Sequence, residues 1–280
     1  MWTNQGHFFF LLAFFICFFW LDVFAFFSGN RIAMSNVIVR NIKFSMVALG
    51  KSIPDTTGDI LNIYSKLGDE GRAQILVNGG DLISAPKNGG VTSNVWIDHC
   101  EFSQEDPRIQ LNQDLYDGLL DIKNESRYIT VSWCYFHDHH KCSLIGSSDK
   151  DIFKDRKITF HHNYYKTIQE RVPLYRGGEA HFFNNYLYDV YTGSVNTRVN
   201  ACVKVEKNYI EKCENNVYSK NSAIVGQAEI VDNVEVDCKR TEVVPSNCVL
   251  NVPYEYSKSL TKDPKKVKGV VMKHAGVGTF

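Results

Sequence analysis

Short stretches of alternating hydrophobic and polar residues recur along the middle of this chain. Five copies cover residues 95–102, 129–136, 158–165, 180–187 and 203–210, and an earlier one covers 37–44. In each of the five, a β-prone segment ends in Cys or Asn, and a hydrophobic residue follows two positions later. Alternation over runs of this length, rich in β-branched and aromatic residues, predicts β-strands that bury one face.

The spacing of the copies predicts how these strands are arranged. Aligned on the Cys or Asn position, successive copies lie 34, 29, 22 and 23 residues apart. A period this short, with a strand in each unit, does not suit helical repeats or propeller blades and is typical of a parallel β-helix. We therefore expect an all-β solenoid in which the aligned residues stack at the same turn of successive coils. These residues are Cys100, Cys134, Asn163, Asn185 and Asn208. A β-sandwich with coincidental spacing is the alternative.

The N-terminus differs in kind from the repeats. Residues 8–21 are an uninterrupted apolar run, followed by Asp22 and a small-residue cleavage motif that ends at Ala25. This is the length of a signal-peptide apolar region, so we expect residues 1–25 to be a signal peptide and the mature protein to be secreted and extracellular. No Lys or Arg precedes the run, which leaves open a membrane anchor over residues 8–27 or an artefact of gene prediction.

Residues 26–280 are expected to form a single solenoid domain. Between the copies at 37–44 and 95–102 lies a long segment with two Gly-Asp-aliphatic phrases. Loops of this length without structure of their own are uncommon in compact domains, and solenoids tolerate insertions at their turns. We therefore interpret residues 46–93 as an insertion between coils.

Composition narrows the classes of protein and of partner. Lys plus Arg and Asp plus Glu are balanced at 31 each, so no global field selects a polyanion. No basic block, zinc-finger spacing or P-loop occurs in the sequence, and we expect no nucleic-acid partner. The chain has eight cysteines. Of these, Cys238 and Cys248 lie in a loop-like stretch and are the expected disulfide, while Cys100 and Cys134 are expected to stay reduced inside the stack.

Three carboxylates are candidates for a metal site. Asp98 follows Val95 and Ile97, which alternate inward, and is therefore expected to point outward. Asp117 and Asp121 share one outward face if their segment is extended. Carboxylates on one face of neighbouring coils repel each other unless a cation joins them, and hard oxygen ligands at an open surface favour Ca²⁺. The alternative is a solvated acidic face.

A second cluster of candidates is basic. Lys141 follows a histidine-rich run at 137–140, and Arg171, Arg176 and Arg198 occur in later coils. Such a set can be solvated surface charge. An acidic trio beside basic side chains on stacked coils instead suggests an anionic polymer that is bridged to the protein through a metal ion.

Seven motifs resemble, in order, those of secreted pectate lyases. They are NVWIDH at 94–99, YDGLLDI at 116–122, YITVS at 128–132, HDHHK at 137–141 with LIGSSD at 144–149, ITFHHN at 158–163, RVPLYRG at 171–177 and HFFNN at 181–185. The resemblance runs from about residue 36 to residues 275–278. It implies a right-handed parallel β-helix enzyme that cleaves de-esterified pectin, or polygalacturonate, by Ca²⁺-dependent β-elimination to 4,5-unsaturated oligogalacturonides.

The resemblance also implies a role for each candidate. By this match the Ca²⁺ ligands are Asp98, Asp117 and Asp121. Arg171 matches the base, Lys141 and Arg176 match the pair that binds the substrate carboxylate, and Arg198 resembles a further substrate contact. We expect a monomer that acts on the polymer without stable membrane association. Three histidines are alternative bases, although stacking at the polar turn is the favoured interpretation for them: His139, His161 and His162.

Two other functions remain open, together with one departure from the family. A pectin lyase would act on methyl-esterified polymer without calcium, and a non-catalytic β-helix would only bind cell-wall polymer. Members of the family usually carry further coils and a capping helix before the copy at 37–44. Here only the apolar leader precedes that copy, so the sequence leaves open whether N-terminal coils and a cap are missing from a truncated gene model.

Overall fold

The computed structural model describes residues 35–45, 61–64, 74–77, 80–84, 93–111, 113, 118–123 and 125–279. The expected signal peptide at 1–25 lies outside these residues, as does much of the expected insertion at 46–93. Both remain predictions.

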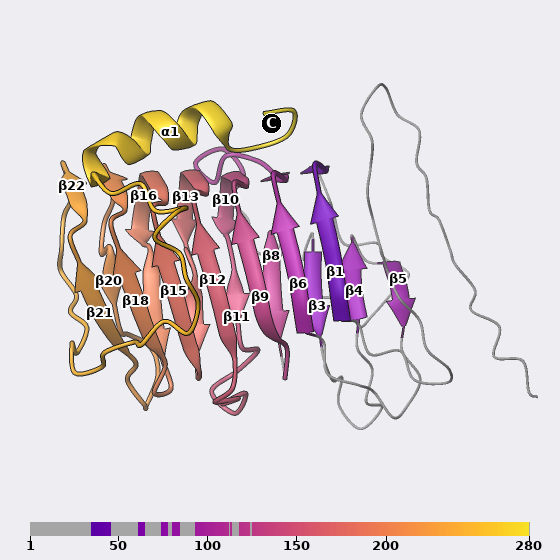
Figure 1. The fold of residues 1–280 in the computed structure, drawn as a ribbon, viewed down its shortest axis with the longest axis horizontal. Coiled ribbons are helices and arrows are strands. Elements are labelled where there is room, and N and C mark those ends of the chain that lie inside the picture. Colours follow the sequence, from indigo (N-terminus) through magenta and orange to yellow (C-terminus); the bar gives the residue numbers. More distant parts are fainter. Residues whose placement is uncertain are drawn as a thin grey trace, which may run out of the picture.

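The strands form three sheets that run side by side along the solenoid (Figure 1). In spatial order, the first sheet contains β1 (Ser35–Arg40), β6 (Ser93–Asp98), β9 (Arg127–Ser132), β12 (Lys157–His161), β15 (Glu179–Phe183), β18 (Cys202–Glu206) and β21 (Gln227–Val231). The second contains β2 (Lys43–Ser45), β7 (Glu101–Ser103), β10 (Tyr135–Lys141), β13 (Tyr164–Glu170), β16 (Tyr186–Gly193), β19 (Tyr209–Glu211) and β22 (Val234–Val236). The third contains β20 (Val217–Tyr218), β17 (Val195–Arg198), β14 (Leu174–Arg176), β11 (Leu144–Ile145), β8 (Leu120–Lys123), β3 (Leu61–Tyr64), β4 (Gln74–Val77) and β5 (Gly80–Ser84).

Strand pairing confirms the all-β parallel solenoid. Every pair in the first two sheets is parallel, and so are the pairs from β3 through β20 in the third. Each sequence copy supplies one strand of the first sheet and the next strand of the second. Only β3, β4 and β5 pair in an antiparallel manner among the described strands, inside the segment interpreted as an insertion.

The stacked polar turn is also confirmed. The side-chain amide of Asn163 donates to Asn185 Oδ1 at 3.0 Å, and that of Asn185 donates to Asn208 Oδ1 at 3.1 Å. The ladder continues to Asn233, whose Oδ1 accepts from Asn208 at 2.8 Å, although the sequence pattern did not reveal this last member. Cys134 joins through its backbone N–H, which donates to Asn163 Oδ1. Because these groups are buried, each amide needs its neighbour as a hydrogen-bond partner.

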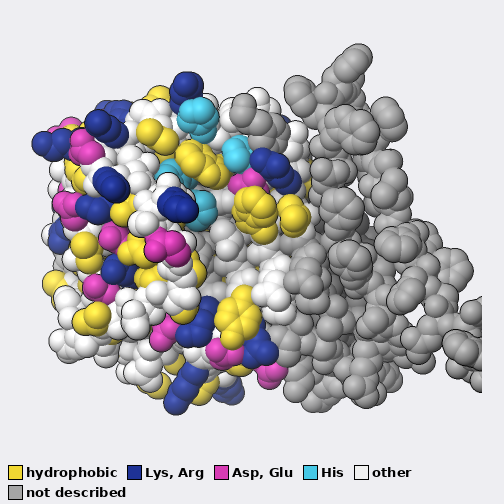
Figure 2. All heavy atoms as spheres, viewed as in Figure 1, with side chains coloured by type: hydrophobic (Ala, Val, Ile, Leu, Met, Phe, Trp, Pro, Cys, Tyr) yellow, Lys and Arg dark blue, Asp and Glu magenta, His cyan; other side chains and the backbone are white. Residues whose placement is uncertain are grey.

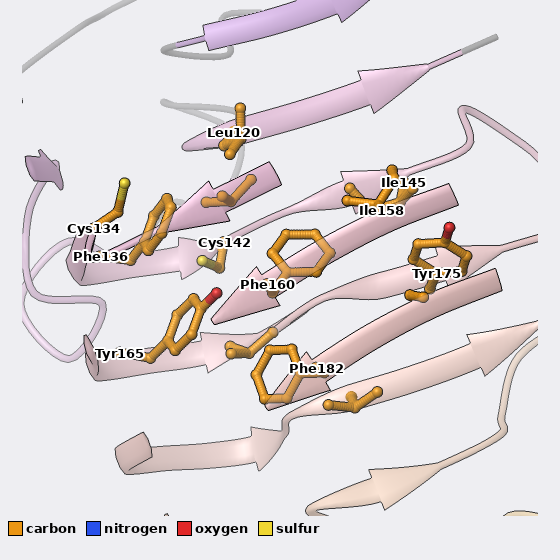
Figure 3. Packing of buried hydrophobic residues seen from close by; sticks show 14 of the residues in the cluster. Leu120, Cys134, Phe136, Cys142, Ile145, Ile158, Phe160, Tyr165, Tyr175 and Phe182 are labelled. Carbon is orange, nitrogen blue, oxygen red and sulfur yellow. The ribbon is translucent and has the colours of Figure 1, made fainter. Parts of the chain in front are cut away.

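Inward-pointing side chains of the three sheets form one core (Figure 3). Phe102, Phe136 and Tyr165 come from successive coils and stack with ring centroids 4.8 and 5.1 Å apart. Phe160 and Phe182 of the first sheet also contact each other from successive coils, with ring centroids 6.0 Å apart and the ring planes tilted by 47°. Burial of each such side chain contributes about 1.5–3 kcal/mol, so the core holds the sheets in register and fixes the positions of the outward side chains.

The expected disulfide between Cys238 and Cys248 is wrong. Cys248 pairs instead with Cys202, with a Cα–Cα distance of 6.0 Å. Cys238 is a free thiol that packs against the core, one coil beyond Cys213. Closeness in sequence was misleading because the chain continues from the last coil into a segment that crosses back over the first sheet. Cys100 and Cys134 are free and buried, as expected.

The C-terminal segment covers the outside of the solenoid and ends in a short helix, α1 (Val267–His274), preceded by a 3-10 turn, η2 (Pro264–Lys266). In Figure 1 the segment crosses in front of the first sheet, and α1 lies along the second. Val267 and Val271 of α1 bury their side chains against Tyr186. Within the described part of the chain, no helix has the length and apolar character needed to cross a membrane.

Candidate active site

Four basic side chains gather where the second sheet turns into the third. Lys141 ends β10, and its Cα partner on the next coil is Glu170 at the end of β13. Arg171 follows directly with a positive φ of 65°, a conformation that turns the chain out of the second sheet. The Glu170 carboxylate lies 3.2 Å from Arg171 Nε. Lys141 and Arg171 therefore come from one corner of neighbouring coils.

Arg176 and Arg198 extend this cluster over the third sheet. They end β14 and β17 and are partners in the parallel register. Arg176 donates from Nε to Asp149 Oδ1 at 2.8 Å and from Nη1 to the Gly146 carbonyl at 3.0 Å. These two bonds fix the plane of its guanidinium group.

Arg198 is the most unusual member of the cluster. Its side chain is only 8% exposed, and its Nε has no hydrogen-bond partner among the described residues. Burial, together with the positive charges of Arg176 and Arg171, lowers its pKa. A buried cation without a full set of partners is costly, so this site favours an anion that would complete its hydrogen bonds.

The structure brings together Lys141, Arg171, Arg176 and Arg198, as expected from the sequence. Among the described residues, the three arginines of this cluster have two carboxylate partners, Glu170 and Asp149. The corner therefore carries surplus positive charge on a chain whose net charge is zero. Planar guanidinium groups in fixed orientations suit bidentate recognition of carboxylates.

Asp121 lies on β8, earlier in the same sheet. Leu120 and Ile122 beside it are buried in the core, as predicted, but Asp121 itself is only 1% exposed and does not lie at an open surface. Its Oδ2 is 2.9 Å from Lys123 Nζ, and its Oδ1 accepts from the backbone N–H of Leu144 at 2.9 Å. This carboxylate is thus nearly buried and already has one cationic neighbour.

Asp98 does not share a face with Asp121, and that expectation is wrong. Asp98 ends β6 in the first sheet, whereas Asp121 belongs to the third. Its carboxylate is 1% exposed and accepts from Ser132 Oγ at 2.6 Å. Arg40 Nε at 2.9 Å and His99 Nδ1 at 2.7 Å complete its contacts. Outward alternation alone does not reveal which side of a three-sided solenoid a residue faces.

The residues described do not by themselves make up a calcium site. Asp117 lies outside them, and the rest contain no group of three His, Cys, Asp or Glu side chains arranged to hold a metal. Ca²⁺ takes six to eight oxygen ligands. Asp121 alone, with its oxygens engaged by Lys123 and Leu144, falls short of that set.

The histidines take structural positions. His162 stacks on Trp133 with ring centroids 4.2 Å apart, and its Nδ1 lies 3.0 Å from Nδ1 of His161. Burial lowers the pKa of His161 to about 4 and that of His162 to about 3. His139 is buried on β10. His161 and His162 lie next to Asn163 of the polar turn and are neutral near pH 7, which agrees with the favoured interpretation for these two, whereas His139 lies inside β10, away from that turn.

Sequence reasoning missed three residues of the site. Glu170, Asp149 and Lys123 pair with Arg171, Arg176 and Asp121. Glu170 and Lys123 could have been found from spacing, because each lies one or two residues from its partner. Asp149 lies in the turn after β11, a coil before Arg176, and its only signal was its place at the end of the LIGSSD motif at 144–149.

Comparison with known proteins agrees with this fold. The family model described as pectate lyase matches residues 79–280. A pectate trisaccharide-lyase of Bacillus licheniformis is 36% identical over 189 residues, which cover 68% of this chain and 53% of that protein. Pectate lyase A of Aspergillus niger is 35% identical over 67% of this chain and 55% of its own length. The chain thus spans about half the length of these relatives.

Two solved structures superimpose on the solenoid. A pectate lyase from Bacillus sp. N165 in complex with trigalacturonate has a TM-score of 0.60 and 35% identity, over 67% of this chain and 60% of that one. Pectate lyase C from Erwinia chrysanthemi, solved with Ca²⁺, has a TM-score of 0.60 and 30% identity, over 67% and 58% of the two chains. With the family model matching well over half of the sequence, this chain belongs to the pectate lyase family.

Proposed function

We propose that this protein is a pectate lyase that cleaves de-esterified pectin by β-elimination. The observation that carries the proposal is the pairing of Arg176 with the buried Arg198 on neighbouring strands, beside Arg171. Among the described residues these three cations have two carboxylate partners, so the corner is suited to a polymer that carries a carboxylate on every residue. The trigalacturonate complex of the Bacillus sp. N165 relative supports the same substrate class.

The proposed β-elimination requires that the negative charge that develops at C5 of the sugar be stabilised. The C5 proton of galacturonate lies next to a carboxylate, whose negative charge opposes formation of a carbanion. Lys141 and Arg176 would neutralise that carboxylate and stabilise the charge that develops as the proton leaves. Arg171 would take the proton from C5. The C5–H electron pair then forms the C4=C5 double bond, and the C4–O bond breaks with its electrons going to the leaving oxygen.

Arg171 needs a neutral guanidinium to act as the base, which is an uncommon state for arginine. Arg171 Nε lies 3.2 Å from the Glu170 carboxylate, the ion pair that a substrate at this corner would meet.

We include Ca²⁺ in the proposal as the cofactor, because the related Pectate lyase C was solved with Ca²⁺. Asp121 is the candidate ligand among the residues that the structure describes, and Asp117 is a second candidate beyond them. When bound, Ca²⁺ would withdraw charge from a substrate carboxylate. No step above depends on it.

We extend the proposal to an extracellular, monomeric enzyme. The disulfide between Cys202 and Cys248 is the kind of bond that persists in oxidising compartments. It agrees with the expected signal peptide at 1–25.

A turnover assay separates the three candidate activities. The 4,5-unsaturated product absorbs in the ultraviolet, so its formation can be followed on polygalacturonate and on methyl-esterified pectin, with Ca²⁺ and with a chelator. A pectate lyase turns over polygalacturonate when Ca²⁺ is present, and its turnover stops when a chelator is added. Turnover of methyl-esterified pectin in chelator would identify a pectin lyase. Binding of polygalacturonate without product would identify a non-catalytic β-helix.

A further inference from the structure

A pocket of about 200 Å³ opens on the outward face of the first sheet, on a different sheet from the basic cluster. Its floor is formed by β9, β12 and β15, and residues 250–254 of the C-terminal segment form one wall. Figure 2 shows this face, where hydrophobic side chains lie next to basic and acidic ones. Sites for drug-sized ligands are larger, about 300–1,000 Å³, so the pocket suits a single ring rather than a longer segment of a ligand.

Two half-exposed tyrosines border the pocket, and both are held in place. Tyr128 has the Arg127 guanidinium 5.4 Å from its ring centroid, and Arg127 is tied to Asp155 at 2.5 Å. The hydroxyl group of Tyr254 lies 2.7 Å from Thr159 Oγ1 and 3.0 Å from His181 Nδ1. Rings fixed in this way lose little freedom when a ligand stacks on them.

The polar groups of the pocket carry no net charge. Lys157 Nζ lies 2.7 Å from Glu179 Oε2, so the cation and the carboxylate balance each other. Burial lowers the pKa of His181 to about 4, so this ring is neutral near pH 7. The basic cluster on the third sheet has surplus positive charge. In this pocket the charge of Lys157 is already balanced by Glu179, so an anionic ligand would be repelled by Glu179.

We propose that this pocket binds one neutral pyranose residue of a polysaccharide, stacked on Tyr128 and hydrogen-bonded by Lys157 and Glu179. An ion pair presents a donor and an acceptor side by side, which matches the hydroxyl groups of a sugar. The apolar face of the pyranose ring would cover the exposed face of the tyrosine. The site goes beyond the proposed lyase activity, because it holds the polymer without cleaving it and takes uncharged sugars.

Trigalacturonate and its fully methyl-esterified form are matched probes, since they share the same sugar rings and differ only at the carboxyl groups, which are anionic in the first and neutral methyl esters in the second. Binding of each to the full chain is measured by calorimetry, with saturation-transfer NMR as a second readout. We expect the esterified form to bind and Tyr128→Ala to weaken this binding about tenfold. Tyr128→Phe keeps the ring and should keep the affinity. Met272→Ala, which removes an exposed apolar side chain on α1, is the control and should change nothing.

Three results would overturn the proposal. The first is that the esterified probe does not bind the wild-type chain. The second is that Tyr128→Ala binds the esterified probe as tightly as the wild type does. The third is that Met272→Ala weakens binding of this probe as much as Tyr128→Ala does. Lyase turnover on polygalacturonate is measured in parallel and should be unchanged by Tyr128→Ala. A chain without lyase activity that still binds the esterified probe through Tyr128 would refute the proposed function and leave this site standing.

Discussion

Arg176 Nε donates to one carboxylate oxygen of Asp149 at 2.8 Å, and the other oxygen accepts from Ser222 Oγ at 2.6 Å. Asp149 follows β11, and Ser222 follows β20, so the two bonds connect the end of β14 with segments that follow two other strands of the third sheet. The hydrogen bond from Ser222 and that from Arg176 hold the pKa of Asp149 below its usual range. Asp149 therefore stays ionised and acts as a positioning residue for Arg176.

Asp149→Asn should weaken substrate binding more than it slows chemistry. The amide keeps the shape of the side chain but loses the charge that orients Arg176, so KM for polygalacturonate should rise about tenfold, with a smaller fall in kcat. Steady-state kinetics separate the two parameters. Asp237→Asn makes the same change at an exposed position and is the control. A fall in kcat at constant KM would show that Asp149 does not act through binding.

Arg171→Lys should abolish most turnover while polymer binding persists. Lysine keeps a positive charge but places its nitrogen differently and cannot reproduce the guanidinium geometry. Loss of a general base typically costs a factor of about 10²–10⁴ in rate. Single-turnover kinetics on polygalacturonate measure the loss, and Arg240→Lys, far along the chain and exposed, is the matched control. Near-normal turnover in Arg171→Lys would assign proton abstraction to another group.

The repeated pattern was sufficient to predict the solenoid and much of its basic cluster. Stacking of Asn163, Asn185 and Asn208 followed from spacing because a solenoid places equivalent positions of successive coils above one another. The same rule brought Arg176 and Arg198 together. Features that repeat with the coil can thus be predicted from one sequence.

Features that depend on which side of the coil a residue faces could not be predicted. Asp98 and Asp121 both alternate outward, yet they lie on different sheets. Cys248 bonds to Cys202 because the C-terminal segment crosses the first sheet, and no periodic signal describes that path. Asp149 comes from a turn of irregular length, where side-chain positions depend on the local conformation of the chain.

Stability should fall as the pH drops from about 6.5 toward 4. The pKa of His161 is lowered to about 4 and that of His162 to about 3, chiefly by burial, from an ordinary value near 6.5. In this range the unfolded chain binds protons that the folded chain does not, so protonation favours unfolding. His162→Phe keeps the stack on Trp133 and should flatten the pH dependence. Denaturant unfolding at several pH values tests this, and an unchanged slope in the variant would contradict it.

Removal of the Asp121 carboxylate should have two effects that a second substitution can separate. Lys123 lies beside it with both side chains nearly buried, so Asp121→Asn leaves a cation without this partner and should cost about 3–5 kcal/mol in the free energy of unfolding. Asp121→Asn combined with Lys123→Met removes both charges and should recover much of that stability. If Asp121 is a calcium ligand, neither variant should bind Ca²⁺ as the wild type does in calorimetry. A stable double variant with a wild-type calcium titration would remove Asp121 from the metal site and leave its ion pair as a structural contact.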